Sequence, residues 1–463
     1  MNKRKPTYLG SAIVVFFAVF PACGSRPGLD RVDAEITVDA EIRPDSEIPS
    51  DGAIFDAAPP MACGESDWMA DGWPMYMGCP ERRGRSKAIG PASPDNIRSL
   101  GETWWETETH GVHIDGLNIG PVVDADGTAY IGSHLMYLMN EYDIYEFWSQ
   151  LFQAFDSEGT ELWRFETQLC DVKITDLSNA PPIGVPTLAG DSVYYFLTRE
   201  CSKFSLRELF SFDHEGRQNW TSQDYRETRD LIVGPDGNLY FSENTLGNNR
   251  IISLDPDGVE RWSFYPGSLR TSLLTMDAEG RIYFGADGVL YSIDQDGNLL
   301  WTEKVADSNS ISLSLGDNGE IYFTGRKSEE EEPQRFLYAV SKKDGSLLWS
   351  QPVTSPGPSV AVGPGGMVVL VTEDGVVAFS PEGHLLWTYE QLSSLPGSPA
   401  IDGEGTIYLA GRGIFAIERD GKLKWQTDEV VASAVAIGAD GSLYAYCRGR
   451  GAFGGSLLCV IEP

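Results

Sequence analysis

The chain has 463 residues, a formal net charge of −33, 50 glycines and 11% aromatic residues. So acidic a surface repels nucleic acid and anionic lipid headgroups, which argues against a nucleic-acid-binding role and leaves solubility as the simplest use of the charge. Abundant glycine without a long amphipathic helix pattern is typical of many short strands joined by tight turns.

The first 22 residues have the features of an export signal. A basic stretch at residues 2–5 precedes an apolar run over residues 8–20, which is too short for a membrane span. The ending Phe20-Pro-Ala-Cys23 resembles the lipobox of bacterial lipoproteins, in which the cysteine is lipidated and becomes the first residue of the mature chain. We predict a lipid anchor at Cys23, with Gly24 favouring the outer membrane or cell surface; a plain secreted protein is the alternative.

Residues 23–62 are predicted to form a disordered acidic linker. Carboxylates spaced among proline, alanine and single aliphatic residues show no sustained period, and too little apolar area is present to offset the entropy of ordering. Such a segment serves most simply as a tether between a lipid anchor and the folded body.

Six cysteines remain after Cys23, and an even number in an exported protein predicts disulfides. Cysteines adjacent in sequence also fall within the same part of the array described below. A metal site is not expected, because none of them stands in a Cys-x-x-Cys pair. We predict the following pairs: Cys63 with Cys79, Cys170 with Cys201, and Cys447 with Cys459.

A five-residue unit, Gly-x-x-x-Trp, recurs eight times and defines an internal repeat. Successive tryptophans are 38 to 58 residues apart, close to the forty-odd residues of a four-stranded propeller blade. The tryptophans are Trp105, Trp163, Trp220, Trp262, Trp301, Trp349, Trp387 and Trp425.

Within each repeat, short apolar runs bounded by Asp-Gly or Glu-Gly turns predict antiparallel hairpins. In the repeat that ends at Trp301, strands are expected near residues 272–276, 281–285, 289–294 and 298–303. A Gly-x-x-Tyr mark recurs on the second strand, at Tyr130, Tyr240, Tyr283, Tyr322, Tyr408 and Tyr444.

The two ends of the array each lack strands. The copy ending at Trp105 has nothing before it to pair with, and the residues after Trp425 supply three strands without a fourth. We therefore predict that the N-terminal strand ending at Trp105 completes the last blade. The result is an all-β, eight-bladed propeller of four-stranded antiparallel blades over residues 63–463, with no open edge between blades.

The segment Trp73-Pro-Met-Tyr76, the sequence from Leu290 to Trp301 and the count of eight resemble the PQQ-like β-propeller repeat family over about residues 70–463. That family includes quinoprotein alcohol dehydrogenases and non-enzymatic members such as the outer-membrane assembly lipoprotein. The resemblance implies the fold, and it leaves open which branch this chain follows.

The repeat motifs are interpreted as structural. Each tryptophan stands on an outermost strand, so we expect all eight to dock neighbouring blades rather than to stack on a cofactor. The Asp-x-Asp-Gly turns that begin at Asp124, Asp255 and Asp294 superficially resemble calcium loops, but they lack the acidic residue that completes an EF-hand. Aspartate and glycine are also what tight turns require.

The longest insertions should all lie on the face opposite the Gly turns, where binding usually resides. They cover residues 134–150, 167–180 with 198–207, and 327–335. The first is the best candidate for a partner-binding surface because it gathers aromatic side chains, which are favoured interface anchors. These are Tyr137, Tyr142, Tyr145, Phe147 and Trp148. The alternative is a short helix that caps the first blade with those rings turned inward.

No catalytic constellation is found. For quinoprotein chemistry the family resemblance would require adjacent cysteines and a set of calcium ligands, yet no two cysteines are adjacent, and His110, His113, His214 and His384 have no recognisable partner. We predict a monomeric, non-catalytic binding or scaffold propeller without cofactor or metal, with an envelope protein or glycan as partner. The alternative is a quinone-dependent dehydrogenase or a carbohydrate-active enzyme that uses the central channel.

Overall fold

The structure is a computed structural model, and it describes a defined part of the chain. The described residues are 75, 77–100, 110–113, 120–138, 145–174, 184–198, 206–226, 228, 231–245, 249–268, 271–305, 312–327, 334–357, 359–390, 398–411, 413–427, 434–448 and 456–463. The predicted signal peptide, Cys23 and the acidic linker lie outside them.

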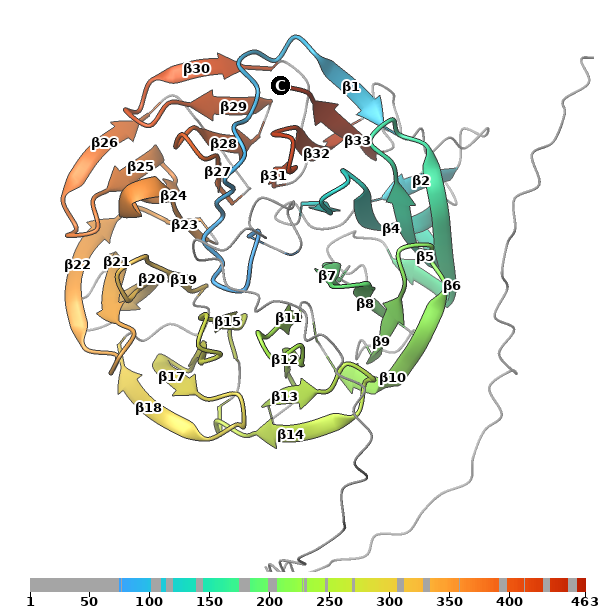
Figure 1. Cartoon of the computed structure of the whole chain (residues 1–463), viewed down its shortest axis with the longest axis horizontal. Helices are drawn as coiled ribbons and strands as arrows, with labels where there is room; N and C mark the ends of the chain where they lie inside the picture. Colours follow the sequence, from blue (N-terminus) through green and yellow to red (C-terminus); the bar gives the residue numbers. More distant parts are fainter. Residues whose placement is uncertain are drawn as a thin grey trace, which may run out of the picture. The chain divides into compact units, whose positions relative to one another are not determined.

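Eight antiparallel sheets are arranged as the blades of a propeller, which confirms the predicted fold (Figure 1). Blade one consists of β3 (Val122–Val123), β4 (Ala129–Leu138), β5 (Tyr145–Phe155) and β6 (Glu161–Ile174), and β2 (His110–His113) also pairs with β4. Blade two consists of β7 (Thr187–Ala189), β8 (Ser192–Thr198), β9 (Leu206–Phe212) and β10 (Gln218–Arg226). Blade three consists of β11 (Ile232–Val233), β12 (Leu239–Glu243), β13 (Arg250–Leu254) and β14 (Glu260–Phe264). Blade four consists of β15 (Thr275–Met276), β16 (Ile282–Ala286), β17 (Val289–Ile293) and β18 (Leu299–Lys304).

Blade five consists of β19 (Ser314–Leu315), β20 (Glu320–Lys327), β21 (Gln334–Ser341) and β22 (Leu347–Val353). Blade six consists of β23 (Val360–Val362), β24 (Val368–Thr372), β25 (Gly375–Phe379) and β26 (Leu385–Tyr389), with a short 3-10 turn at Pro364–Gly366. Blade seven consists of β27 (Ala400–Ile401), β28 (Ile407–Ala410), β29 (Ile414–Ile417) and β30 (Leu423–Gln426). Blade eight consists of β31 (Ala436–Ile437), β32 (Leu443–Arg448), β33 (Ser456–Ile461) and β1 (Ile97–Leu100).

The ring closes through β1, the N-terminal strand, which pairs antiparallel with β33 near the C-terminus. In blade four the tryptophan lies opposite a small residue, Ser292 against Trp301. In blade eight, Val460 takes the place of Ser292, and the residue opposite it on β1 is Arg98, at the position of the tryptophan. The closure is confirmed; Trp105 lies outside the described residues, beyond the described end of β1.

The repeated glycine and tryptophan belong to one contact between adjacent blades. Trp349 Nε1 donates to the Pro381 carbonyl at 2.7 Å, and a Cβ on Gly383 would come within 2.7 Å of the Trp349 ring. The ring therefore needs a residue without a side chain in the next blade. The same contact pairs Trp163 with Gly216, Trp220 with Gly258, Trp262 with Gly297, Trp301 with Gly345, and Trp387 with Gly421.

The aspartates of the repeat stabilise its turns. In blade seven, Asp402 Oδ1 accepts the backbone N–H groups of Glu404 at 3.0 Å and Thr406 at 2.8 Å, while Oδ2 accepts the Tyr408 hydroxyl at 2.9 Å. Asp124, Asp255 and Asp294 use one carboxylate oxygen in the same way. These contacts explain the Asp-x-Asp-Gly pattern through turn formation alone.

The segment from Met77 to Pro91, here called the strap, crosses the inner strands (Figure 1, blue). Its carbonyls at Pro80, Glu81 and Arg83 accept N–H groups from blades four, five and six. The Gly84 carbonyl accepts the N–H of Ile401 in blade seven at 2.7 Å. Four successive blades are thus joined by backbone hydrogen bonds to a single segment, which the repeat pattern does not reveal.

The cysteines are described only in part. Cys79 and Cys459 are each disulfide-bonded. Cys63 and Cys201 lie outside the described residues, and Cys447 and Cys170 lie on β32 and β6. The predicted pairings therefore stay predictions.

The blade contact predicts the effect of adding one methyl group. Gly383 has φ of +86°, so Gly383→Ala combines backbone strain with a clash against Trp349. We expect a loss of about 2–4 kcal/mol in the free energy of unfolding, measured by urea denaturation. The control is Gly319→Ala, which has φ of +90° and nothing within 4 Å of the added Cβ, and should lose only about 1 kcal/mol. Equal losses in the two variants would contradict the blade contact.

Candidate functional site

The two faces of the ring differ in the connections that they carry. The Gly turns join the first strand of each blade to the second and the third to the fourth, so they share one face. The second-to-third connections and the links between blades lie on the other, here called the loop face. On the loop face, blade five extends a hairpin up to Lys327 and Gln334, whereas the blade six hairpin closes at once through Glu373 and Asp374.

The aromatic insertion of blade one forms a hairpin, so the alternative of a short capping helix is wrong. Tyr137 on β4 pairs with Glu146 on β5, and β5 continues from Tyr145 to Phe155. Runs rich in aromatic residues favour strand pairing over helix, which explains the difference. Tyr145, Phe147 and Trp148 lie on β5, with Trp148 at a register shift between Phe147 and Ser149, and Tyr142 lies outside the described residues.

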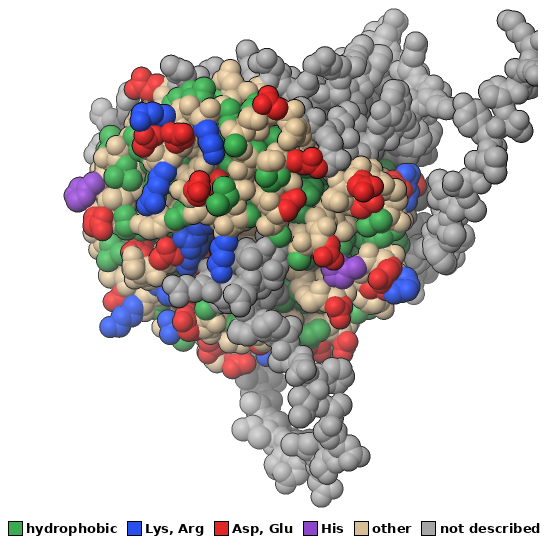
Figure 2. Space-filling model, turned by 45° about the horizontal axis from the view of Figure 1, so that its top comes forward, with side chains coloured by type: hydrophobic (Ala, Val, Ile, Leu, Met, Phe, Trp, Pro, Cys, Tyr) green, Lys and Arg blue, Asp and Glu red, His purple; other side chains and the backbone are tan. Residues whose placement is uncertain are grey.

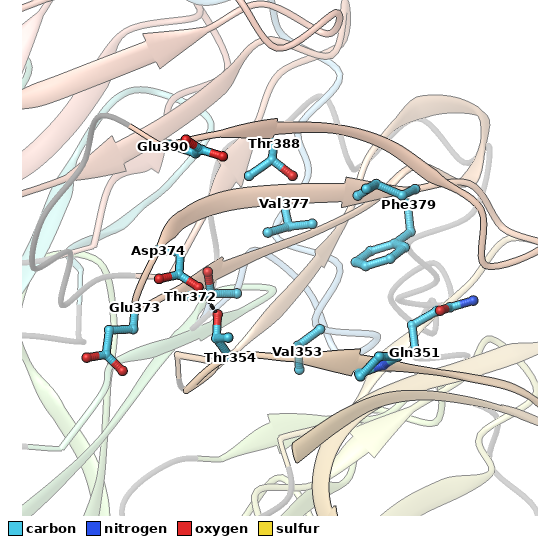
Figure 3. A pocket seen from close by; sticks show the side chains of 12 residues that line it. Gln351, Val353, Thr354, Thr372, Glu373, Asp374, Val377, Phe379, Thr388 and Glu390 are labelled. Atoms are coloured by element: carbon cyan, nitrogen blue, oxygen red, sulfur yellow. Dashed lines mark hydrogen bonds between the residues drawn. The ribbon is translucent and has the colours of Figure 1, made fainter. Parts of the chain in front are cut away.

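A groove of about 810 Å³ lies between the outer strands of blades five and six (Figure 3). It is lined by Gln351, Pro352, Val353, Thr354, Thr372, Glu373, Asp374, Val377, Phe379, Leu385, Thr388 and Glu390. It opens toward the loop face, because Thr354, Asp374 and Glu390 all stand at strand ends on that side. The groove therefore adjoins the face on which binding was predicted.

The floor of the groove is apolar. Val353 on β22 and Val377 on β25 are partly buried, and Phe379 is buried against Trp349 with a ring-centroid distance of 6.4 Å. Because Trp349 is already held by blade six, this floor is positioned by the same contact that docks the two blades. A partner side chain would meet a preformed apolar surface.

The mouth of the groove is acidic. Glu373, Asp374 and Glu390 are exposed carboxylates, and the Thr354 hydroxyl donates to Asp374 Oδ2 at 2.5 Å. Among the residues that the structure describes, none of the three carboxylates has an ion pair. A second hollow of about 380 Å³ shares Pro352, Val353, Thr354 and Glu373 with the groove and brings in Arg335 at its far side.

The sequence did not identify this groove. It lies between the last strand of blade five and the strands β24 to β26 of blade six, so no single repeat encodes it. The available signal was the two-residue Glu373-Asp374 connection following soon after the long insertion at residues 327–335.

The sequence also did not predict the contacts of one histidine. His214, in the turn before β10, has Nδ1 2.8 Å from the Tyr130 hydroxyl and 3.7 Å from Asp124 Oδ2 in blade one, while Nε2 lies 3.1 Å from the Gly190 carbonyl. The nearby Asp124 carboxylate, to which the Tyr130 hydroxyl donates, raises the pKa of His214 to about 9. The imidazolium therefore links blade two to blade one at neutral pH, at a place on the Gly-turn face far along the chain from the groove.

This link predicts a pH-dependent stability. The folded-state pKa of His214 lies above its unfolded value of about 6.5, so its stabilisation is complete below pH 6.5 and is lost as the pH rises through 9. The side chain is 36% exposed, so screening limits the effect to about 1 kcal/mol. His214→Gln should remove this dependence in denaturation curves between pH 6 and 10. His384→Gln, in an exposed turn, should keep it, and an unchanged profile for His214→Gln would contradict the link.

No helix among the described residues is long and apolar enough to cross a membrane. In the same part of the chain, no group of three or more histidine, cysteine, aspartate or glutamate side chains is arranged to hold a metal ion.

Comparison with known proteins gives one family and a set of structural neighbours. A family model described as outer membrane protein assembly factor BamB matches residues 149–318 and 286–434. No curated protein matches the chain. A europium-containing methanol dehydrogenase is 13% identical with a TM-score of 0.55, over 84% of this chain and 90% of that one. The quinohemoprotein alcohol dehydrogenase from Comamonas testosteroni is 13% identical with a TM-score of 0.56, over 85% and 81%.

BamB from Moraxella catarrhalis is 14% identical with a TM-score of 0.45, over 79% of this chain and 98% of that one. At these identities the similarity of the solved structures to this chain concerns the fold alone, and it transfers no activity. The two matched ranges together cover residues 149–434, from β5 of blade one through blade seven.

Proposed function

Because the chain belongs to the β-propeller family of the outer membrane protein assembly factor BamB, we propose that it is a non-catalytic binding propeller of the cell envelope. A protein or glycan partner would bind at the loop face, and the lipid on Cys23 would hold the propeller at the membrane through the acidic linker. The observation that carries the proposal is the groove between blades five and six. It combines an apolar floor with exposed carboxylates that have no ion pair among the described residues.

An enzyme that uses the central channel is the other class of function. The binding role is favoured over it because the strap lies across the Gly-turn ends of the inner strands of blades four to seven, where the channel of such an enzyme would open. Met77 packs there against Ala361 and Ile401. Dye-linked alcohol oxidation by the protein supplied with quinone and calcium would overturn the non-catalytic assignment.

The anchor is tested by one substitution. Cys23→Ser removes the thiol that would carry the lipid, so we expect loss of fatty-acid labelling and release of the propeller from the membrane fraction. Cys79→Ser is the control, since it removes a cysteine of the folded part and should leave the labelling unchanged. Labelling that persists in Cys23→Ser would mean that the cysteine is not the anchor.

The binding face is tested by photo-crosslinking in cells. A photoreactive amino acid at Thr354, exposed at the groove, should capture a partner from the envelope. The matched control replaces Lys343, which is exposed on the Gly-turn face of the same blade and should capture none. Equal products at both positions, or none at Thr354, would place binding elsewhere.

A further inference from the structure

We infer that the groove between blades five and six binds an extended basic and apolar peptide segment of a partner protein. An apolar side chain of that segment would lie on Val377 and Phe379, and a lysine or arginine would lie among Glu373, Asp374 and Glu390. The inference rests on the proposed function, because it names the chemistry of the partner at the same face. It is argued from the shape, floor and charge of the groove.

The shape favours an extended segment. The groove runs between β22 and β26, and about 810 Å³ accommodates several side chains in a row. In Figure 3, Gln351 and Val353 come from one wall, while Thr388 and Glu390 come from the other. Pro352 on β22 has no N–H to donate to an added strand, so recognition falls to side chains rather than to the backbone of that edge.

The carboxylates of the groove favour a positively charged ligand. The carboxylates come from two separate places on blade six, the β24–β25 turn and the end of β26, and they stand at the same end of the groove (Figure 3). Within the described residues they have no ion pair, and Arg335 is a lining cation only in the adjoining hollow. A cationic group placed between them gains charge-assisted hydrogen bonds in addition to the one that the Thr354 hydroxyl donates to Asp374.

The net charge argues against a second copy of the chain as the occupant. The chain has 68 acidic residues against 35 lysines and arginines, and the described face in Figure 2 shows acidic side chains spread widely over its surface. A copy would bring like charge to an acidic mouth. A basic segment of another protein satisfies both the mouth and the apolar floor.

The test measures binding of fluorescein-labelled octapeptides by fluorescence anisotropy. The basic probe alternates lysine with valine and phenylalanine, and two control peptides replace each lysine by glutamine or by glutamate. We expect the basic peptide to bind at least tenfold more tightly than the glutamine peptide, the glutamate peptide not to bind, and the affinity to fall as salt is raised.

Variants assign the binding to the groove. The double variant Glu373→Gln, Asp374→Asn should weaken binding of the basic peptide at least tenfold, and Thr388→Trp should do the same by filling the groove. The double variant Asp257→Asn, Glu404→Gln makes the same change of charge at exposed turns of the Gly-turn face, so it should stay within twofold of the unmodified protein. All three substitute exposed side chains, and circular dichroism checks that they fold.

Two results would overturn the inference. One is a basic peptide that binds no better than the glutamine peptide, and the other is binding that the groove variants do not change. If Thr354 nevertheless crosslinks to a neutral or acidic segment or to a glycan, the binding role of the loop face stands and only the chemistry of the partner is wrong. If Thr354 captures no partner and the basic peptide shows no preferred binding, the binding role of the loop face is wrong as well.

Discussion

The contact between a tryptophan and the glycine of the next blade is the constraint on which the ring depends. The ring of Trp387 lies where any side chain at Gly421 would have to be, and its Nε1 donates to the Arg419 carbonyl of the same turn at 2.8 Å. The positive φ that the glycine adopts also shapes that turn. One five-residue unit thus closes a hairpin within its own blade and receives the tryptophan of the blade before it. This double use explains why the offset between glycine and tryptophan never varies.

The junction between blades seven and eight depends on the N-terminal segment instead of the repeat. Trp425 of blade seven donates Nε1 at 3.0 Å to the carbonyl of Pro91, which belongs to the strap and not to a hairpin of blade eight. The strap then leads into β1, which completes blade eight. Residues 77–100 therefore join four blades at the inner strands and close the ring at the rim. The closure is a long-range event, since β1 and β33 are separated by nearly the whole folded chain.

Whether the sequence predicts a contact depends on how far apart in the chain the contacting residues lie. Asp402, Gly421 and Trp425 act within their own or a neighbouring repeat, so their spacing predicts the blades and the closure. The strap residues Arg82 and Arg83 contact carbonyls and carboxylates about two hundred residues away, and no local pattern reports such contacts. The groove and the partner of His214 were missed for the same reason, because each needs two blades in their final packing.

Variation in function can therefore come only from parts of the chain that the blade contact leaves free. The Gly-turn ends are fixed by aspartate, glycine and tryptophan, and the second strands are buried on both sides between blades, as in β16 and β24. The hairpin lengths on the loop face carry no such restriction. In blade six the connection between β24 and β25 is short, and its residues Glu373 and Asp374 stand at the mouth of the groove. Under the proposed function, this two-residue turn would set the chemistry of the partner, whereas the apolar surface beneath it is positioned by Trp349.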